Sequence, residues 1–458
     1  MIAMFRRFFH LYALFALAGF ASASAENKPV SYYNDVVPIL KRSCTGCHHP
    51  GKLKGDLDLT THAAFKKGGK HGPAFKEGDP KTSNIIEEIS GKDPSMPKEG
   101  DPLSGAEVAM IERWISEGAS DDTPADKKNP FKITEAPVYT APAVISTMAY
   151  SPDGELLAIS GYHETLLYKS DGSELSARLL GDSPRIESVA FSKDGKLLAV
   201  SGGAPALMGE VQIWDVQKRT LLRAIQLSSD SIYGVSFSPE GDRIACGGAD
   251  KSVRLINVAD GKELFKFDNH SDWVFATTFS VDGKRVLSGS RDRAMKLINA
   301  SNAQFIDDIN KLLENVICIA RHPKEDIIAY GGDTGGVRTY RMQENQGRTA
   351  ANNDVNLVRE YERQPAAVHA VCYSPDGSFL AVGGAADEIR IYKTSDGSRA
   401  GTCKGFSGAI FSLTAHPTRP LLAAGGFDGK VHVYAIPAGQ ETNSFVPFPI
   451  KTKAVAAR

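Results

Sequence analysis

One unit of about 42 residues recurs seven times between residue 145 and the C-terminus, and this recurrence restricts the fold more than any other feature of the chain. Each copy opens with a β-branched residue that begins an apolar run; the seven openings are Ile145, Ile186, Ile232, Val274, Val316, Val368 and Ile410. In five copies a tight hairpin turn follows, as at Asp282-Gly283. A second run then ends in small residues, as in Ala245-Cys246-Gly247, and a third closes the copy. The pattern predicts repeated β-hairpins.

The spacing of the copies is regular. Each first run ends in a Ser or His, and these residues lie 41, 46, 42, 42, 52 and 42 positions apart: Ser151, Ser192, Ser238, Ser280, His322, Ser374 and His416. Residues 143–447 therefore resemble the WD40 family, whose propeller blades have four strands each. The resemblance implies an all-β propeller of seven blades. Only Trp214-Asp215 keeps the Trp-Asp pair of that family.

Four polar residues of the repeats have an expected structural role. His270 and Asp292 fall in one copy, and we expect them to join a hydrogen-bond network inside a blade. His322 and His416 each precede Pro at the same position of two copies. A shared repeat position favours turn structure over metal binding.

Insertions and ring closure can also be predicted. The two long gaps between copies place insertions at Ala204 to Gly209 and at Glu344 to Asn356. We expect both in loops on one rim, where binding partners are usually held, so the propeller is predicted to dock a protein. Because a closed ring has no free edge, we expect residues 138–140 to complete the sheet of residues 410–435.

A different signature stands near the N-terminus. Cys44-Thr45-Gly46-Cys47-His48 reads Cys-x-x-Cys-His, the attachment signature of c-type haem. The thiols of Cys44 and Cys47 would form thioethers with the two vinyl groups, and His48 would bind the iron as the proximal ligand. A zinc site needs a second Cys or His pair at similar spacing, and the next Cys is Cys246. A redox dithiol does not need His48. The motif predicts one covalently attached haem c.

The second axial ligand is predicted less directly. Met96 stands before Pro97 some fifty residues past His48, and a thioether is a soft ligand that raises the reduction potential relative to a second imidazole. A loop Met that fills an apolar gap is the alternative role. His71 and His62 are the alternative ligands.

Helical spacing predicts the elements around the motif. We expect helices over 31–43, over 82–90 and from the capping box Ser104-Gly105-Ala106-Glu107 to about Glu117. The Gly- and Lys-rich stretch from His49 to Pro80 is expected to be mostly loop. Its lysines would steer an acidic partner or form an ordinary solvated surface: Lys52, Lys54, Lys66, Lys67, Lys70 and Lys76.

Residues 36–118 resemble the planctomycete-type cytochrome c domain, a small single-haem module. The shared pattern runs through Val-Val-Pro-Ile-Leu, the Cys44 to His48 motif, Gly55-Asp56-Leu57-Asp58-Leu59, Gly68-Gly69, Gly72-Pro73-Ala74, Gly78-Asp79-Pro80, Ser83, Met96-Pro97, Leu103-Ser104 and Trp114. The resemblance implies a small all-α, class I-like cytochrome c fold with Met96 as the distal ligand. The chain departs from it at Lys98, where such domains usually have a second Pro.

The N-terminus carries an export signal. Arg6 and Arg7 precede an apolar run from Leu11 to Ala21, and Ala23-Ser24-Ala25 is a typical cleavage site. The run has about half of the ~20 residues that a membrane span needs, although a retained anchor is the alternative. We expect a signal peptide over 1–25, a periplasmic or otherwise extracytoplasmic protein, and no transmembrane segment after cleavage.

Composition and cysteine content complete the domain plan. The chain has 458 residues, of which 42% are hydrophobic and 23% charged, and its net charge of -1 gives no indication of nucleic-acid binding. We expect a cytochrome domain over 26–120, a linker over 121–142, the propeller over 143–447 and a tail over 448–458. The remaining cysteines are expected to be buried thiols, with a disulfide as the alternative: Cys246, Cys318, Cys372 and Cys403.

Three functions follow from this plan. A haem with His and Met ligands has no open iron position, which predicts electron transfer to a redox partner in the cell envelope rather than an enzyme. A haem oxidoreductase that holds a substrate on the propeller is one alternative. A non-catalytic envelope scaffold or redox sensor is the other.

Overall fold

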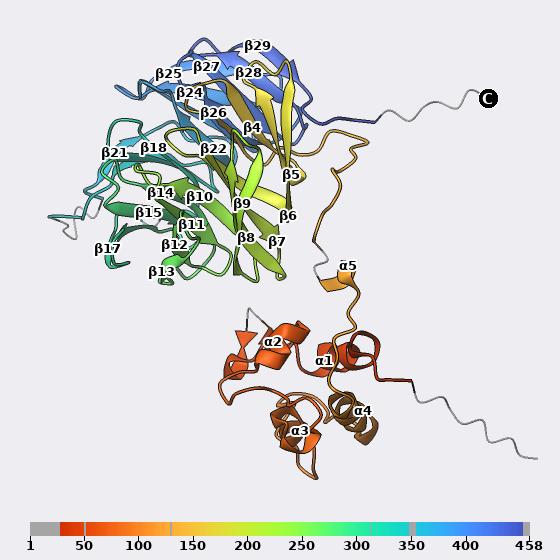
Figure 1. Cartoon of the computed structure of the whole chain (residues 1–458). Helices are drawn as coiled ribbons and strands as arrows, with labels where there is room; N and C mark the ends of the chain where they lie inside the picture. The colour runs from red at the N-terminus through yellow and green to blue at the C-terminus, as the bar shows by residue number, and fades with distance from the viewer. Residues whose placement is uncertain (1–27, 50–51, 129–130, 312, 348–353, 452–458) are drawn as a thin grey trace, which may run out of the picture. The chain divides into compact units, whose positions relative to one another are not determined.

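The computed structural model describes residues 28–49, 52–128, 131–311, 313–347 and 354–451. The chain forms two compact units, Met1–His49 with Lys54–Pro124 and Pro50–Leu53 with Ala125–Arg458 (Figure 1). The predicted signal peptide over 1–25 lies outside the described residues. Within the described part of the chain, no helix is long and apolar enough to cross a membrane.

Short helices make up the first unit. Its helical elements are a π-helical turn (Tyr32–Val36), α1 (Val37–Ser43), α2 (His62–Lys67), α3 (Asn84–Ile89), α4 (Gly105–Ser116) and 3-10 turns at Lys54–Asp56 and Pro80–Thr82. Two short strands, β1 (His48–His49) and β2 (Lys52–Leu53), pair with each other. The short helix α5 (Ala125–Lys128) follows the first unit.

Local sequence signals set the bounds of these helices. α4 begins at the predicted capping box: the Ser104 N–H donates to Glu107 Oε2 (2.8 Å), and the Glu107 N–H donates back to Ser104 Oγ. The helix α2 lies in the stretch that we predicted to be mostly loop. The Thr61 side chain caps it, and Gly68 ends it at a φ of 75°. The many glycines of this stretch predicted loop, and the helix of six residues within it was therefore not expected.

Aromatic side chains form the core of the first unit. Trp114 of α4 is almost fully buried and stacks on Tyr32, with ring centroids 5.2 Å apart. Phe65 of α2 and Phe75 pack edge to face at 4.8 Å and both contact Trp114. Aromatic pairs of this kind contribute beyond their buried area, so a few rings fix the packing of short helices.

Antiparallel sheets make up the second unit. A seven-stranded sheet contains, in order, β3 (Met148–Tyr150), β4 (Leu156–Ser160), β5 (Tyr162–Lys169), β6 (Leu175–Phe191), β7 (Leu197–Ala204), β8 (Met208–Asp215) and β9 (Thr220–Ser228). The 17-residue β6 pairs with β5 through residues 175–180 and through Arg185, and with β7 through residues 185–191.

Five further sheets have four strands each among the described residues. The first contains β10 (Ile232–Phe237), β11 (Arg243–Gly248), β12 (Val253–Asn257) and β13 (Glu263–Phe267). The second contains β14 (Val274–Phe279), β15 (Arg285–Ser290), β16 (Met295–Asn299) and β17 (Phe305–Asp308). The third contains β18 (Val316–Arg321), β19 (Ile327–Gly332), β20 (Val337–Arg341) and β21 (Leu357–Glu360). The fourth contains β22 (Val368–Tyr373), β23 (Phe379–Gly384), β24 (Ile389–Lys393) and β25 (Arg399–Cys403). The last contains β26 (Ile410–Ala415), β27 (Leu421–Gly426), β28 (Val431–Ala435) and β29 (Gln440–Phe445).

The sheets are arranged in a closed ring. The first strand of each four-stranded sheet contacts the first strand of the next, from β10 through β14, β18 and β22 to β26. The strand β26 contacts β3, β3 contacts β6, and β6 contacts β10, which returns to the start. Apolar residues fill the space between neighbouring sheets, so the core of the unit is distributed around the ring.

The prediction for ring closure is wrong. Residues 138–140 do not complete the last sheet, because β29 already occupies its outer edge. Tyr139 instead forms a parallel bridge with Ile450. The ring closes through contacts of the last sheet with β3, including hydrogen bonds from the Met148 N–H to Ser412 Oγ (2.8 Å) and from the Ile145 N–H to Gly426 O (3.0 Å). We call this junction the seam.

The two insertions are not on one rim. Ala204 to Gly209 joins the second and third strands of its copy, β7 and β8, whereas Glu344 to Asn356 joins the third and fourth, β20 and β21. Since strands alternate in direction, these connections lie at opposite ends of the ring. The gap lengths in the sequence could not distinguish the two ends.

Candidate functional site

The Cys-x-x-Cys-His motif continues the end of α1 as a series of turns. The Cys44 N–H donates to Leu40 O (2.8 Å), and the Cys47 and His48 N–H groups both donate to Cys44 O (3.1 Å). Both cysteines are free and half-buried. Burial raises the pKa of the Cys44 thiol to about 11 against the opposing charge of Arg42. A redox dithiol needs a lowered thiol pKa, so the environment of Cys44 does not favour that alternative.

A backbone carbonyl orients His48. The imidazole Nδ1 lies 2.9 Å from Lys54 O. Because a carbonyl can only accept, Nδ1 carries the proton and Nε2 keeps a free lone pair. Histidine metal ligands are typically held in this way by their second ring nitrogen. The arrangement suits His48 to bind a metal through Nε2.

Met96 belongs to a half-buried apolar surface of the first unit. Its N–H donates to Glu88 O (2.9 Å) near the end of α3. It is one of six half-buried apolar residues that pack against the core of the unit: Val37, Cys44, Leu57, Met96, Val108 and Met110. The predicted anchor Cys44 and the predicted ligand Met96 therefore both pack against the same core.

The alternative histidine ligands have other surroundings. His62 Nε2 lies 2.8 Å from Ala119 O, and its ring packs edge-on against Tyr32 and Trp114. These contacts join α2 to the end of α4, which is a structural role. His71 is exposed. Among the described residues, no group of three or more His, Cys, Asp or Glu side chains could hold a metal ion.

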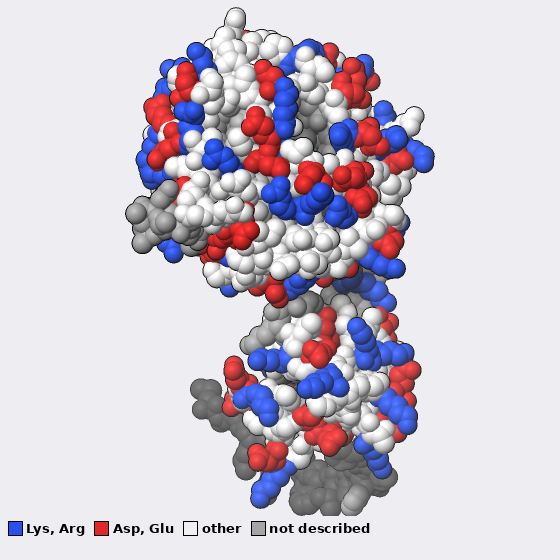
Figure 2. Space-filling view, turned by 90° about the vertical axis from the view of Figure 1, so that its left-hand side faces the viewer, with Lys and Arg blue, Asp and Glu red and all other residues white. Residues whose placement is uncertain are grey.

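The predicted basic rim is partly neutralised. Lys66 pairs with Glu77 (2.7 Å), and Lys76 pairs with Asp79 (3.3 Å). Acidic and basic side chains are interleaved over the face of the chain shown in Figure 2. Mixed charges give a weaker long-range field than a run of lysines in the sequence indicates.

The predicted blade network is confirmed. His270 Nδ1 lies 2.8 Å from Asp292 Oδ2, and His270 Nε2 lies 2.7 Å from Ser288 Oγ. Burial opposes the ionisation of Asp292, but its hydrogen bond with His270 and two backbone N–H groups outweigh burial and lower its pKa. A related cluster in the next sheet has no sequence signature: there Arg338 donates to Glu314 Oε1 (2.8 Å).

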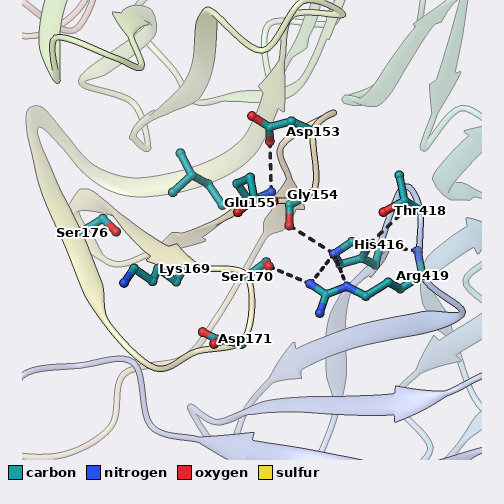
Figure 3. Close-up of a pocket in the computed structure, with 11 residues that line it drawn as sticks. Asp153, Gly154, Glu155, Lys169, Ser170, Asp171, Ser176, His416, Thr418 and Arg419 are labelled. Carbon is teal, nitrogen blue, oxygen red and sulfur yellow. Dashed lines mark hydrogen bonds between the residues drawn. The ribbon is translucent and has the colours of Figure 1, made fainter.

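The two repeat-position histidines hold turns, as predicted. His416 Nε2 lies 3.1 Å from Gly154 O across the seam (Figure 3). The Arg419 guanidinium donates to Ser170 Oγ (2.8 Å) beside it, over a hollow of about 440 Å³. His322 accepts a hydrogen bond from the Lys324 N–H at Nδ1 (3.4 Å), and its ring lies against Gly377 of the next sheet, where an added methyl would lie 2.0 Å from Nε2. The hollow marks the place where the first and last repeats meet.

The four cysteines of the second unit are free thiols. Cys246 and Cys403 are buried, while Cys318 and Cys372 are half-buried. Burial raises the pKa of the Cys246 and Cys403 thiols to about 12. Each behaves as a small apolar residue in the packing between strands.

Comparison with known families identifies segments in both units. Residues 44–100 match the family described as Planctomycete cytochrome C. Residues 219–257, 261–299 and 397–435 match the WD domain, G-beta repeat, and residues 320–414 match the Anaphase-promoting complex subunit 4 WD40 domain.

Similar curated proteins match short parts of the chain. WD repeat-containing protein 1 of Mus musculus is 31% identical over 119 residues, which is 26% of this chain and 18% of that protein. Protein groucho of Drosophila melanogaster is 32% identical over 60 residues, which is 13% of this chain and 8% of that protein. The chain thus spans less than a fifth of these relatives. The family matches show that the chain joins a Planctomycete cytochrome C domain to WD40 repeats.

Proposed function

We propose that the chain is an exported c-type cytochrome that carries one covalent haem and passes electrons, and that its propeller docks the redox partner. In this proposal Cys44 and Cys47 anchor the haem, and His48 and Met96 are the axial ligands. The cytochrome family and the predicted signal peptide over 1–25 both support export.

The residues of the first unit fit a haem. The observation that most supports a haem is the orientation of His48. Its Nδ1 is hydrogen-bonded to Lys54 O, so that Nε2 is free to bind iron. Cys44 and Met96 are both half-buried apolar residues on the core of this unit, and a flat apolar macrocycle would cover such residues.

The chain's residues would restrict the chemistry to electron transfer. Bound haem supplies a carrier of one electron. His48 and Met96 would fill both axial positions, which leaves none for substrate, and the Met96 thioether would favour the reduced state. The apolar surroundings would exclude water and so also raise the reduction potential.

The propeller is proposed to have seven blades. The long β6 takes part in two four-stranded groups, β3–β6 and β6–β9, so the seven-stranded sheet counts as two blades beside the five separate sheets. WD40 repeats indicate protein–protein interaction. A partner bound to the ring would be tethered to the same chain as the electron carrier, which raises its effective concentration there.

A haem stain after denaturing electrophoresis tests the attachment. The chain is expressed with its signal peptide in a host that matures c-type cytochromes, and the periplasmic fraction is examined. We expect stain at the size of the chain and none in the cytoplasm. Stain that survives in the Cys44→Ala, Cys47→Ala double variant would contradict the anchor assignment. Rapid binding of carbon monoxide by the wild type would favour the sensor or enzyme alternatives.

A further inference from the structure

One position of the repeat holds a basic residue in each of the five four-stranded sheets. It is the second residue of the third strand, and the five residues are Arg254, Lys296, Arg338, Arg390 and His432. Each of them pairs with at least one carboxylate at 3.0 Å or less, and the three arginines pair with two carboxylates each. The position therefore places a cation among acidic groups within each sheet.

His432 occupies this position in the last sheet, and both of its ring nitrogens face carboxylates. Nε2 lies 2.9 Å from Asp428 Oδ2, and Nδ1 lies 2.8 Å from Glu441 Oε1. Because an ionised carboxylate can only accept, both nitrogens must donate, and only the protonated ring has two N–H groups. The arginines and the lysine keep their charge near neutral pH, whereas a histidine ordinarily loses its proton between about pH 5 and 8. His432 is therefore the member of the set that can lose its charge.

No further ionised group lies against the His432 ring among the contacts of the described residues. The side chain is 5% exposed, and the ring of Phe406 packs on it with centroids 4.7 Å apart. Tyr434 stacks at 6.3 Å, and burial raises the pKa of this phenol, so it stays neutral. The residues opposite His432 on the adjacent strands are Ala424 of β27 and Ser444 of β29, which carry no charge.

The two carboxylates differ in their access to water. The Asp428 side chain is 11% exposed and also accepts the Lys430 N–H at Oδ1 (3.0 Å), whereas the Glu441 side chain is 38% exposed. Lys404 and Lys430 are exposed, and neither forms a described ion pair with these carboxylates. A neutral ring donates only one hydrogen bond, and the carboxylate nearer water is the more easily rehydrated. Loss of the proton should therefore release Glu441, which lies on β29.

The strand β29 and the residues after it hold the seam together. The ring of Phe445 lies 5.4 Å from that of Tyr168 in the first repeat. The Tyr168 hydroxyl donates to Pro447 O (2.6 Å). Phe448 is buried against Tyr139, with ring centroids 4.8 Å apart. The strand that carries Glu441 is thus also the one that joins the last repeat to the first and to the segment between the two units.

We propose that His432 is a pH-sensitive clasp, whose imidazolium holds β29 and residues 446–451 closed over the seam. We call these residues the strap. Two carboxylates stabilise the charged ring in the folded state, so the contribution of the clasp is fully present in mild acid. It is lost as pH rises through the titration of His432, and the strap then loosens and frees Tyr139. The inference goes beyond the proposed function and does not depend on haem.

Hydrogen exchange of the full-length protein, measured by mass spectrometry, tests the clasp. Exchange is followed at about pH 6 and about pH 8.5, on either side of the ordinary histidine range, with labelling times scaled for the intrinsic pH dependence. We expect β29 to lose about tenfold in protection at the higher pH. The strand β13 is the internal control and should not change, because Arg254 keeps its charge. Equal protection of β29 at both pH values would overturn the proposal.

Two substitutions at the same position sharpen the test. His432→Arg installs the residue that three other sheets have, so β29 should stay protected at both pH values. His432→Gln is neutral and keeps one hydrogen bond, so β29 should exchange quickly at both. A pH dependence that persists in His432→Arg contradicts the proposal, since another group would then be responsible. Should the arginine variant not fold, His432→Gln decides alone: protection equal to the wild type at about pH 6 would contradict the clasp.

Two further readouts place the effect. Residues 134–142, around Tyr139, should lose protection together with β29, while β10 stays protected. A loss of protection throughout the ring would overturn the clasp in favour of general destabilisation. Haem stain is measured on every variant and should be unchanged. Because the exchange is read in the ring, failure of the clasp leaves the proposed function standing, and a chain without haem can still show the clasp.

Discussion

The two units of the chain bury their apolar residues in different ways. In the ring, each sheet packs against its two neighbours, and opening residues such as Ile232 and Val274 are fully buried. In the described part of the first unit, the longest helix has twelve residues, and Met96 and Leu57 remain half-buried on the core. In the ring, the apolar face of each repeat is covered by the neighbouring repeats. In the first unit, apolar residues stay half-buried on the core, and under the proposed function a haem would cover them.

The difference concerns where stability comes from. A repeat ring gains stability from every interface between neighbouring copies, so no single element is indispensable. A small unit with few helices has a high ratio of surface to volume and often needs a cofactor or other support. Under the proposed function, the stability of the first unit should therefore depend on haem, and that of the ring should not.

Loss of the haem anchors should have the largest effect. We expect the Cys44→Ala, Cys47→Ala variant to lose all covalent haem and to unfold its helices at a lower temperature, while the β-rich transition stays unchanged. Circular dichroism melts of both proteins measure this. A β transition that falls together with the helical one would show that the ring depends on the haem.

Loss of the proposed sulfur ligand should come next. Met96→Ala should abolish the weak charge-transfer absorbance near the red end of the oxidised spectrum and open the iron to cyanide, because the thioether is removed. His71→Ala is the control and should leave the spectrum unchanged. Persistence of the band in Met96→Ala would make His62 or His71 the leading ligand.

Within the ring, the buried His270 and Asp292 pair should matter most. His270→Ala leaves the Asp292 carboxylate buried without its partner and should cost about 3 kcal/mol of unfolding free energy, measured by urea denaturation. Haem content should stay at the wild-type level. An effect below about 1 kcal/mol would mean that Ser271 and water compensate for the lost imidazole.

The same pair predicts a pH dependence. The pKa of Asp292 is lowered in the folded state. The ionised carboxylate therefore contributes fully to the free energy of unfolding above its ordinary pKa of about 4, and this contribution is lost as pH falls through the folded pKa. The wild-type ring should lose stability below about pH 4. The His270→Ala variant should lose less stability than the wild type over the same fall in pH. Equal acid profiles for the two proteins would contradict the coupling.

The smallest effect is expected at a helix cap. Ser104→Ala removes the capping box of α4 and should cost about 1 kcal/mol in the helical transition alone. The Ser104 hydroxyl and N–H hold the pKa of Glu107 at about 2, so the variant should raise it toward the ordinary value. Nuclear magnetic resonance titration of the Glu107 carboxyl measures the change.

Local patterns predicted the parts of the molecule that depend on adjacent residues. The α4 cap, the hairpin turns and the His270 network all involve residues of one helix or one repeat, where spacing fixes geometry. The helix α2 was missed because it has only six residues and lies in a stretch whose other parts are rich in glycine. His48 was identified by the motif, but the carbonyl that orients it lies six residues away and has no side-chain signature.

The sequence by itself determined the repeat, its period and the motif from Cys44 to His48, because each is written in contiguous residues. Only the tertiary structure decided how the ring closes and which connections share an end. Tyr139 pairs with Ile450, and Ser412 holds Met148, across more than 260 residues. Such contacts depend on the summed twist and packing of all the sheets, which no single repeat encodes.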